Sequence, residues 1–403
     1  MSGPSLLVPG GIATPRGFRA AGVSAGIKAN GHPDLMLLVA DAPAHAAAVF
    51  TTNKVIAAAV SVSKEHLQRS GGVVRAIVVN SGCANSCTGD QGVADAREMT
   101  ATTANLVGCP SEQVLVASTG VIGVNLPMDR VRAGLPAAFE ALGADQGAAA
   151  ARAIMTTDLA PKESAARIAI GGGPVTIGGM AKGAGMIEPN MATMLGFVTT
   201  DASVPKPLLD RALRDAVDRS FNAITVDGDS STNDCVMLLA SGASGVTIDD
   251  AGYGPFVEAL TTVCRELALA IVRGGEGATK LVTVNVTGAA TGAEARRAAK
   301  VIANSLLVKT ALHGGDPNWG RLICAAGRAS VAFDASRAEV TIGPLVLFKN
   351  GQPHDELAPA AADYLKAKEL TIGVDLGSGS ASSTVWTCDL SAEYVRINAD
   401  YRT

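Results

Sequence analysis

Residues 178–202 read GGMAKGAGMIEPNMATMLGFVTTDA, and this stretch is the most informative part of the sequence. A glycine-rich run with apolar side chains comes first, and Pro189-Asn190 is a turn signal. A second apolar run follows the small-residue pair Ala192-Thr193. The pattern predicts two strands joined by a turn, with Thr193 opening the second strand, a position that a β-branched residue favours.

The chain on either side of this stretch predicts a mixture of strands and helices. Because these do not alternate in a regular βαβ order, we expect α+β layers rather than a doubly wound parallel sheet. A core domain is expected at 1–280 and a smaller C-terminal α+β domain at 281–403. Strand-like runs lie at 35–40, 46–52, 57–63, 75–80, 113–118, 167–172 and 281–289. Helix-like runs lie at 90–108, 127–141, 145–155, 206–221, 255–274, 294–312 and 356–367.

The composition argues against several classes of partner. Apolar residues make up 48% of the 403 residues, enough for a large core, although aromatic residues supply only 3%. The formal charge of -4 is spread along the chain without a basic run, so neither nucleic acid nor a membrane surface is expected as a partner. No run of about 18 apolar residues predicts a membrane span.

The cysteines predict a reducing, cytoplasmic setting. There are seven, an odd number, and most lie within apolar stretches. The first residues show no signal-peptide pattern. Cys83 and Cys87 are four residues apart, but no second pair or nearby histidine completes a zinc pattern, so no metal is expected.

The residues around Thr193 permit its hydroxyl to act as a nucleophile. A threonine hydroxyl beside a strained peptide bond can attack the preceding carbonyl, and water then cleaves the resulting ester. The released threonine has both a hydroxyl nucleophile and an α-amine whose reference pKa is about 7.7–8.0. Such an amine can serve as the general base for its own hydroxyl.

One motif around Thr193 resembles a known family. KGAGMIEPNMATML (182–195) is similar to the processing and nucleophile motif of the ornithine acetyltransferases, also called glutamate N-acetyltransferases. Further blocks follow the family's order over essentially the whole chain. These are TPRGFRAAGVSAGIK (14–28), NSGCANSCTG (80–89), ASTGVIG (117–123), LPMD (126–129), IMTTD (154–158), STND (231–234), GEGATK (275–280), LVKTALHGGDPNWGR (307–321) and YVRINADYRT (394–403).

The resemblance implies roles for particular residues. Thr193 matches the nucleophile, and Ala192-Thr193 matches the cleaved bond, giving an α-chain 1–192 and a β-chain from 193. Thr119 and Gly120 match an oxyanion hole, where a hydroxyl and a backbone N–H stabilise the negative oxygen of a tetrahedral intermediate. The substrate-binding positions that match are Thr156, Lys182, Thr193, Glu276, Asn398 and Thr403.

Two positions depart from the family pattern. Gly274 stands where the family usually has Asp before Gly-Glu-Gly, and Cys83 stands where the family usually has Asn. Both departures concern substrate tuning rather than the reaction class. His313 within LHGGDPNWG is more readily explained as a structural residue in a turn than as a catalytic one.

The resemblance implies ping-pong acetyl transfer from N2-acetylornithine to glutamate, without a metal or organic cofactor. Acetyl-CoA is left open as a second donor. The implied fold is a layered α/β/β/α-type sandwich, and the implied assembly contains two α-chains and two β-chains. Two alternatives to an acetyltransferase are considered. One is an aminopeptidase or amidohydrolase of related fold with an N-terminal nucleophile, and the other is a non-catalytic protein that is never cleaved.

Overall fold

The computed structural model describes residues 5–188 and 194–400, and the packing of the chain divides it into two compact units. Unit 1 holds the chain up to Asn222 together with Asp229–Ile271. Unit 2 combines Ala223–Gly228 with Val272–Tyr401. The domain boundary expected at residue 281 lies within unit 2.

Among the described residues, the strands of unit 1 form one nine-stranded sheet in the order β1-β6-β7-β8-β9-β3-β4-β5, with β2 paired to β3. The pairs β4–β5 and β8–β9 are parallel, and the others are antiparallel. The sixteen-residue β3 breaks its register with β4 between Val39 and Ala44 and pairs with β9 from His45. The strands are β1 Leu6–Val8, β2 Phe18–Val23, β3 Leu35–Phe50, β4 Val73–Cys83, β5 Val114–Val121, β6 Lys162–Ile170, β7 Gly173–Lys182, β8 Leu195–Thr200 and β9 Cys235–Ala240.

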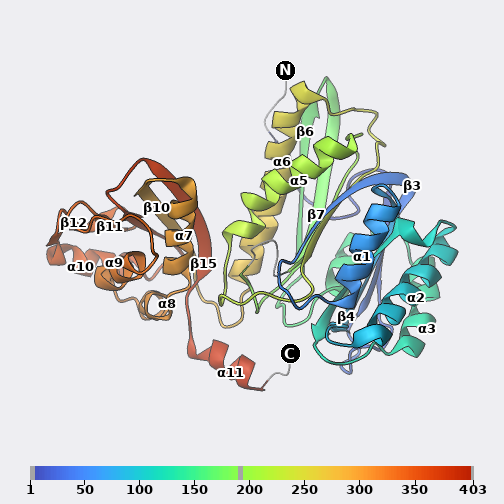
Figure 1. The fold of residues 1–403 in the computed structure, drawn as a ribbon, viewed down its shortest axis with the longest axis horizontal. Helices are drawn as coiled ribbons and strands as arrows, with labels where there is room; N and C mark the ends of the chain where they lie inside the picture. The colour runs from blue at the N-terminus through green and yellow to red at the C-terminus, as the bar shows by residue number, and fades with distance from the viewer. Residues whose placement is uncertain (1–4, 189–193, 401–403) are drawn as a thin grey trace. The chain divides into compact units, whose positions relative to one another are not determined.

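Helices cover the outer surfaces of this sheet. One buried cluster joins side chains from both halves of the sheet, including Ile77 of β4, Phe197 of β8 and Met237 of β9. A second cluster packs β3, β4 and β5 against α1, α2 and α3. α5 contacts β3 and β9, and α6 lies beside β6 and β7 (Figure 1). The helices are α1 Ala58–Arg69, α2 Gly89–Val107, α3 Met128–Glu140, α4 Gly147–Ala153, α5 Lys206–Asp218 and α6 Asp250–Arg273.

The expectation of a strand at residues 57–63 is wrong, because this run opens α1. Small and apolar side chains at helical spacing are buried on one side of the helix, among them Ala59, Val62 and His66. The hydroxyl of Ser63 also donates to the Val116 carbonyl at 2.6 Å and accepts from the Val116 N–H at 2.7 Å. The short run AAAVSVS fits the helical and the strand period equally well, and packing against β5 decides in favour of the helix.

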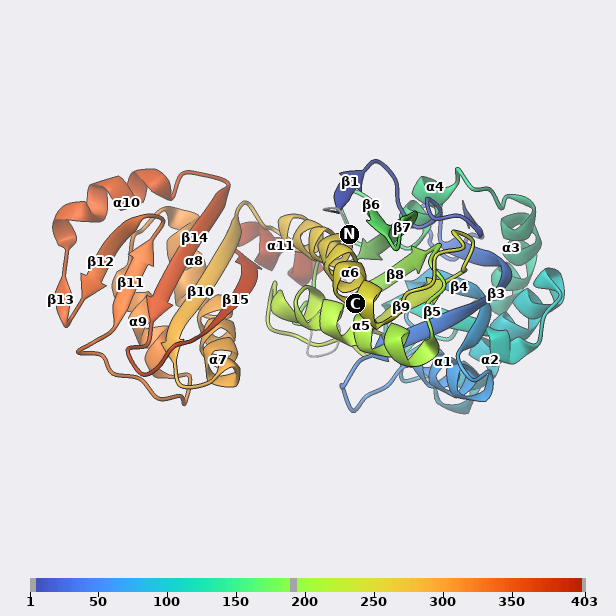
Figure 2. The same cartoon turned by 90° about the horizontal axis from the view of Figure 1, so that it is seen from above.

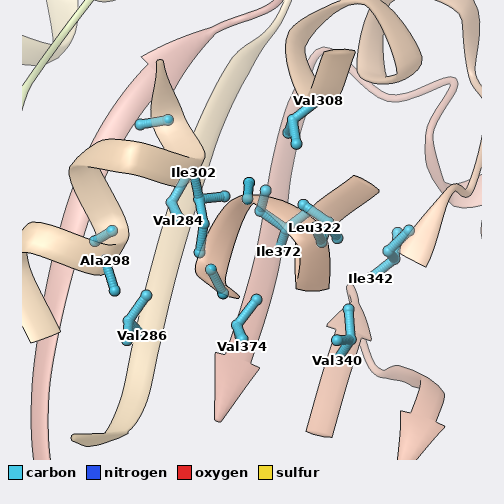
Figure 3. Close-up of a cluster of buried hydrophobic side chains, with 14 of the residues drawn as sticks. Val284, Val286, Ala298, Ile302, Val308, Leu322, Val340, Ile342, Ile372 and Val374 are labelled. Atoms are coloured by element: carbon cyan, nitrogen blue, oxygen red, sulfur yellow. The ribbon is translucent and has the colours of Figure 1, made fainter. Parts of the chain in front are cut away.

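Unit 2 is built on a separate six-stranded sheet, ordered β13-β12-β11-β14-β10-β15 among the described residues (Figure 2). Side chains from α7, α8 and α9 point toward those of β10, β11 and β14 and form one core (Figure 3). The elements are β10 Leu281–Ala289, α7 Gly292–Ala303, α8 Leu306–Gly314, α9 Trp319–Gly327, β11 Glu339–Ile342, β12 Leu345–Lys349, β13 Gln352–Pro353, α10 Ala358–Tyr364, β14 Glu369–Asp375, β15 Ala381–Cys388 and α11 Ala392–Asp400.

Residues 294–312, expected to form a single helix, belong to two helices. α7 ends at Ala303, and Ser305 caps the start of α8 by accepting a hydrogen bond from the Val308 N–H at 3.5 Å. The other expected helices are present with shifted ends, and the expectation of mixed strands and helices is confirmed. No helix in the described parts of the chain is long and apolar enough to cross a membrane.

The core of unit 2 gives a stability prediction. Ile302 is completely buried, whereas Leu306 is 66% exposed. Ile302→Ala should lower the free energy of unfolding by about 2–5 kcal/mol, since it removes buried methyl groups and leaves a cavity. Leu306→Ala, the matched control, should change it by no more than about 0.5 kcal/mol. Urea unfolding monitored by circular dichroism measures both, and equal effects would contradict the assigned core.

Candidate active site

The ends of two parallel strands build one side of the candidate site in unit 1. β4 and β5 pair in register through Asn80↔Ser118 and Ser81↔Thr119, so their last residues lie side by side. Gly120 has a φ of +131°, and a Cβ on it would lie 2.3 Å from the carbonyl carbon of Gly82. Only glycine fits there, so Gly120 allows the end of β5 to lie against β4.

Lys182 lies beside this end of β5. It is the last residue of β7, and its Nζ donates to the Thr119 Oγ1 at 3.3 Å. Both side chains are at most 9% exposed. The structure therefore brings together two of the predicted site residues, which the sequence separates by 63 positions.

Asp158 connects a further predicted residue, Thr156, to Lys182. Its Oδ2 accepts from the Thr156 N–H at 3.1 Å, and its Oδ1 accepts from the Gly183 N–H at 2.7 Å and from the Lys162 Nζ at 2.5 Å. Burial alone would raise the pKa of this carboxyl group. The charges of Lys182 and Lys162 and the Gly183 hydrogen bond outweigh burial and lower the pKa to about 2.

A half-buried lysine, Lys28, supports the same region. The Lys28 Nζ donates to the Met155 carbonyl at 2.7 Å and to the Pro33 carbonyl at 2.9 Å. Burial lowers its pKa, the charge of Asp34 opposes that change, and the charge of Lys182 adds to it. Lys28 therefore anchors the segment that leads to Thr156.

The STND segment also belongs to this site. The amide of Asn233 donates to the Ala84 carbonyl at 2.6 Å and to the Ser118 carbonyl at 2.9 Å. Asn233 thus ties the start of β9 to the strand that carries Thr119. Cys83, one of the departures from the family pattern, is buried there, and its thiol donates to the Val124 carbonyl at 3.1 Å.

Unit 2 places two other predicted residues in contact. The Asn398 amide on α11 donates to the Glu276 carboxylate at 2.9 Å. Gly277 has a φ of +69°, and a Cβ on it would lie 2.4 Å from the Tyr394 nitrogen, so glycine allows α11 to approach this loop.

Asp389 holds the same loop from the other side. Its carboxylate accepts from the Thr279 N–H at 2.7 Å, the Lys280 N–H at 2.9 Å and the His313 Nδ1 at 2.7 Å. His313 lies in α8 rather than in the expected turn, and its contact with Asp389 suits a structural role.

Three predicted site residues, Ala192, Thr193 and Thr403, lie outside the described residues. Sequence reasoning missed Lys28, Asp34, Asp158 and Asp234, although three of them lie in or end a family-like block. Nothing in the spacing of these residues marks them as neighbours. Within residues 5–188 and 194–400, no group of three or more His, Cys, Asp or Glu side chains is placed to hold a metal ion.

Comparisons with known proteins place these features in a family context. The profile of the ArgJ family matches residues 19–403. The arginine biosynthesis bifunctional protein ArgJ of Symbiobacterium thermophilum is 51% identical over 399 residues, covering 98% of this chain and 99% of that protein. Its counterpart in Geobacter sulfurreducens is 50% identical and covers 96% of this chain and 99% of that protein.

Two solved structures are also similar. One chain of ArgJ from Bacillus halodurans is 46% identical with a TM-score of 0.50, and the match covers 52% of this chain and 100% of that chain. One chain of the ornithine acetyltransferase of Mycobacterium tuberculosis, solved with ornithine, is 41% identical with a TM-score of 0.43. That match covers 47% of this chain and 100% of that chain.

The buried Asp158–Lys162 pair gives a stability prediction. Asp158→Asn removes the carboxylate that neutralises the buried Lys162, so the free energy of unfolding should fall by about 3–5 kcal/mol. The control is Asp210→Asn, which breaks the half-buried pair with Lys206 and should cost less than about 1 kcal/mol.

The pH dependence of that stability follows from the lowered pKa. The Asp158 contribution is fully present above the ordinary value of 3.8 and is lost as the pH falls toward about 2. Denaturant titrations between pH 5 and pH 2 should show a smaller acid loss in Asp158→Asn than in the wild type. Identical acid profiles would mean that Asp158 is not ionised in the folded protein.

Proposed function

Since the chain belongs to the ArgJ family, we propose that it transfers acetyl groups by a ping-pong reaction through an acetyl ester on Thr193. The chain is an acetyltransferase of arginine biosynthesis. N2-acetylornithine as donor and glutamate as acceptor follow from its ornithine acetyltransferase motifs. The observation that carries the mechanism is the contact between Thr119 and Lys182, two residues from separate motifs of the family.

Self-cleavage before Thr193 comes first in this proposal. The Thr193 Oγ attacks the Ala192 carbonyl, the C–N bond breaks as nitrogen takes a proton, and water hydrolyses the ester. Residues 193–403 make up the same 52% share of this chain that the fully aligned Bacillus halodurans chain covers. This agreement supports a native chain end at Thr193.

Acetyl transfer then uses the freed amino terminus. The Thr193 amine takes the hydroxyl proton while Oγ attacks the acetyl carbonyl of N2-acetylornithine, and the proton passes to the departing ornithine nitrogen. Glutamate reverses these steps and leaves as N-acetylglutamate. The Thr119 hydroxyl and the Gly120 N–H stabilise the oxyanion in both halves of the reaction, and their place in the paired strand β5 supplies the pre-organisation that such stabilisation needs.

The family motifs assign substrate binding to Thr156, Lys182, Thr193, Glu276, Asn398 and Thr403. The ammonium group of Lys182 suits a substrate carboxylate, and Thr156 is fixed beside it through Asp158. Glu276 suits the substrate ammonium group, and Asn398 is hydrogen-bonded to it. Thr403 completes the proposed set.

Further features of the proposal concern architecture and setting. The two core clusters of unit 1 support an α/β/β/α sandwich, in which the inner faces of the folded sheet pack together. Domains at 1–280 and 281–403, an assembly of two α-chains with two β-chains, and a cytoplasmic location remain predictions. The word bifunctional in the names of the relatives supports acetyl-CoA as a second donor.

Self-cleavage is tested by intact mass spectrometry of the purified protein. The wild type should give two chains, the second beginning Thr-Met-Leu, and Thr193→Ala should stay whole. Incubation with acetylornithine alone should add one acetyl group to the chain that begins at Thr193, and the same test with acetyl-CoA reports the second donor. An uncut but fully active wild type would refute the nucleophile, and acetate release without transfer would indicate a hydrolase.

The oxyanion role gives a kinetic prediction. In protein that has been cut, Thr119→Ala should slow formation of the acetyl-enzyme by about 10²–10³-fold, because one oxyanion donor is lost. Thr100→Ala is the control, since Thr100 is equally buried but lies in α2 and bonds the Arg97 carbonyl. Single-turnover mass spectrometry measures both rates, and similar rates would remove Thr119 from the mechanism.

A further inference from the structure

Asp234 lies level with the residue that follows Thr193. β8 and β9 are parallel and in register at Leu195↔Cys235, so Met194 and Asp234 directly precede the paired ends. The Cys235 N–H donates to the Met194 carbonyl at 3.1 Å, and the Met194 N–H donates to the Asp234 carboxyl group. Asp234 is thus tied to the residue next to the proposed scissile bond.

One oxygen of this carboxyl group has no partner. Asp234 is 2% exposed, and its Oδ2 makes no hydrogen bond with any described residue. Buried polar atoms are almost always paired, so an orphaned carboxyl oxygen needs an explanation. Asp201, at the other end of β8, is equally buried but accepts from the Thr176 N–H at 2.8 Å and pairs with Arg16 at 3.6 Å.

The surroundings favour the neutral form of Asp234. Burial raises its pKa well above the ordinary range, against the opposing effects of Ser231, Lys182 and the Met194 N–H. A neutral carboxyl group carries one proton that it can donate. Since its other oxygen receives the hydrogen bonds, Oδ2 is the atom that holds this proton.

We propose that Asp234 is the general acid of the self-cleavage and gives its Oδ2 proton to the Thr193 nitrogen as the peptide bond breaks. The inference rests on the self-cleavage described under Proposed function. It assigns a role to the STND motif, in which Asn233 fixes the oxyanion strand and Asp234 serves the neighbouring nucleophile.

The acyl shift needs no proton from outside the protein. The Thr193 Oγ forms a bond to the Ala192 carbonyl carbon, and the C–N bond breaks. Asp234 gives its proton to the nitrogen and takes the proton that the Thr193 hydroxyl loses. The carboxyl group therefore ends as it began, and the product is an ester with a free α-amine. Water then adds to the ester, which releases the Ala192 carboxylate and restores the hydroxyl.

The first test compares two buried carboxyl groups on the same strand pair. Asp234→Asn keeps the size and an acceptor for the Met194 N–H but loses the acidic proton. Its self-cleavage, followed by intact mass during cell-free synthesis, should slow by about 10²–10⁴-fold. Asp201→Asn should cut at the wild-type rate. A folded Asp234→Asn protein that cuts as fast as the wild type overturns the proposal, whereas an uncut wild type overturns the proposed function instead.

Hydroxylamine separates the acid role from a role in ester hydrolysis. It cleaves an ester that has already formed but not an ordinary peptide bond such as Ala192-Thr193. Added to uncut Asp234→Asn, it should release no fragment that begins at Thr193, since the ester is not formed. Rapid release would place Asp234 after the acyl shift and would refute the proposal.

Formate rescue provides a second variant. Asp234→Ala leaves space for a small carboxylic acid, and sodium formate should accelerate its self-cleavage at least about tenfold over sodium chloride, given the usual size of a general acid effect. Near-UV circular dichroism checks that each variant is folded. A folded Asp234→Ala protein that formate does not rescue counts against proton donation by this side chain.

Discussion

The buried carboxylate of Asp158 is the interaction on which the arrangement of unit 1 around Lys182 depends. A charge without water must be neutralised and hydrogen-bonded, and Asp158 meets this requirement with Lys162, the Thr156 N–H and the Gly183 N–H. Thr156 and Lys162 flank Asp158 in the sequence, whereas Gly183 follows the end of β7. Satisfying one carboxylate therefore fixes the loop of Thr156 and the end of β7 at the same time.

Parallel strand pairs position the groups to which we assign the proposed chemistry. β4 with β5, and β8 with β9, each bring two strand ends to the same level. Gly120 allows the first pair to approach closely, and Asn233 joins the second pair to the first. Thr119, Gly120 and Lys182 consequently lie in paired strands, and Asp234 directly precedes β9, which limits their motion.

In unit 2, the buried carboxylate of Asp389 joins separate segments of the chain in the same way. Asp389 accepts hydrogen bonds from Thr279 and Lys280, which lie in the GEGATK block, and from His313 of another block. Glu276 precedes this anchored stretch and bonds Asn398. Blocks that look independent in the sequence are thus partners in one hydrogen-bond network.

The sequence alone determined the reaction class, the nucleophile candidate and most helices, because motifs and apolar periodicity are local properties. It did not determine that residues 57–63 are helical, since the short run AAAVSVS fits both periods and only packing of Ser63 against Val116 decides. It also did not identify Asp158 or Asp234. Burial and hydrogen-bond satisfaction depend on which distant segments meet, and only the tertiary structure brings Gly183 to Asp158 and Met194 to Asp234.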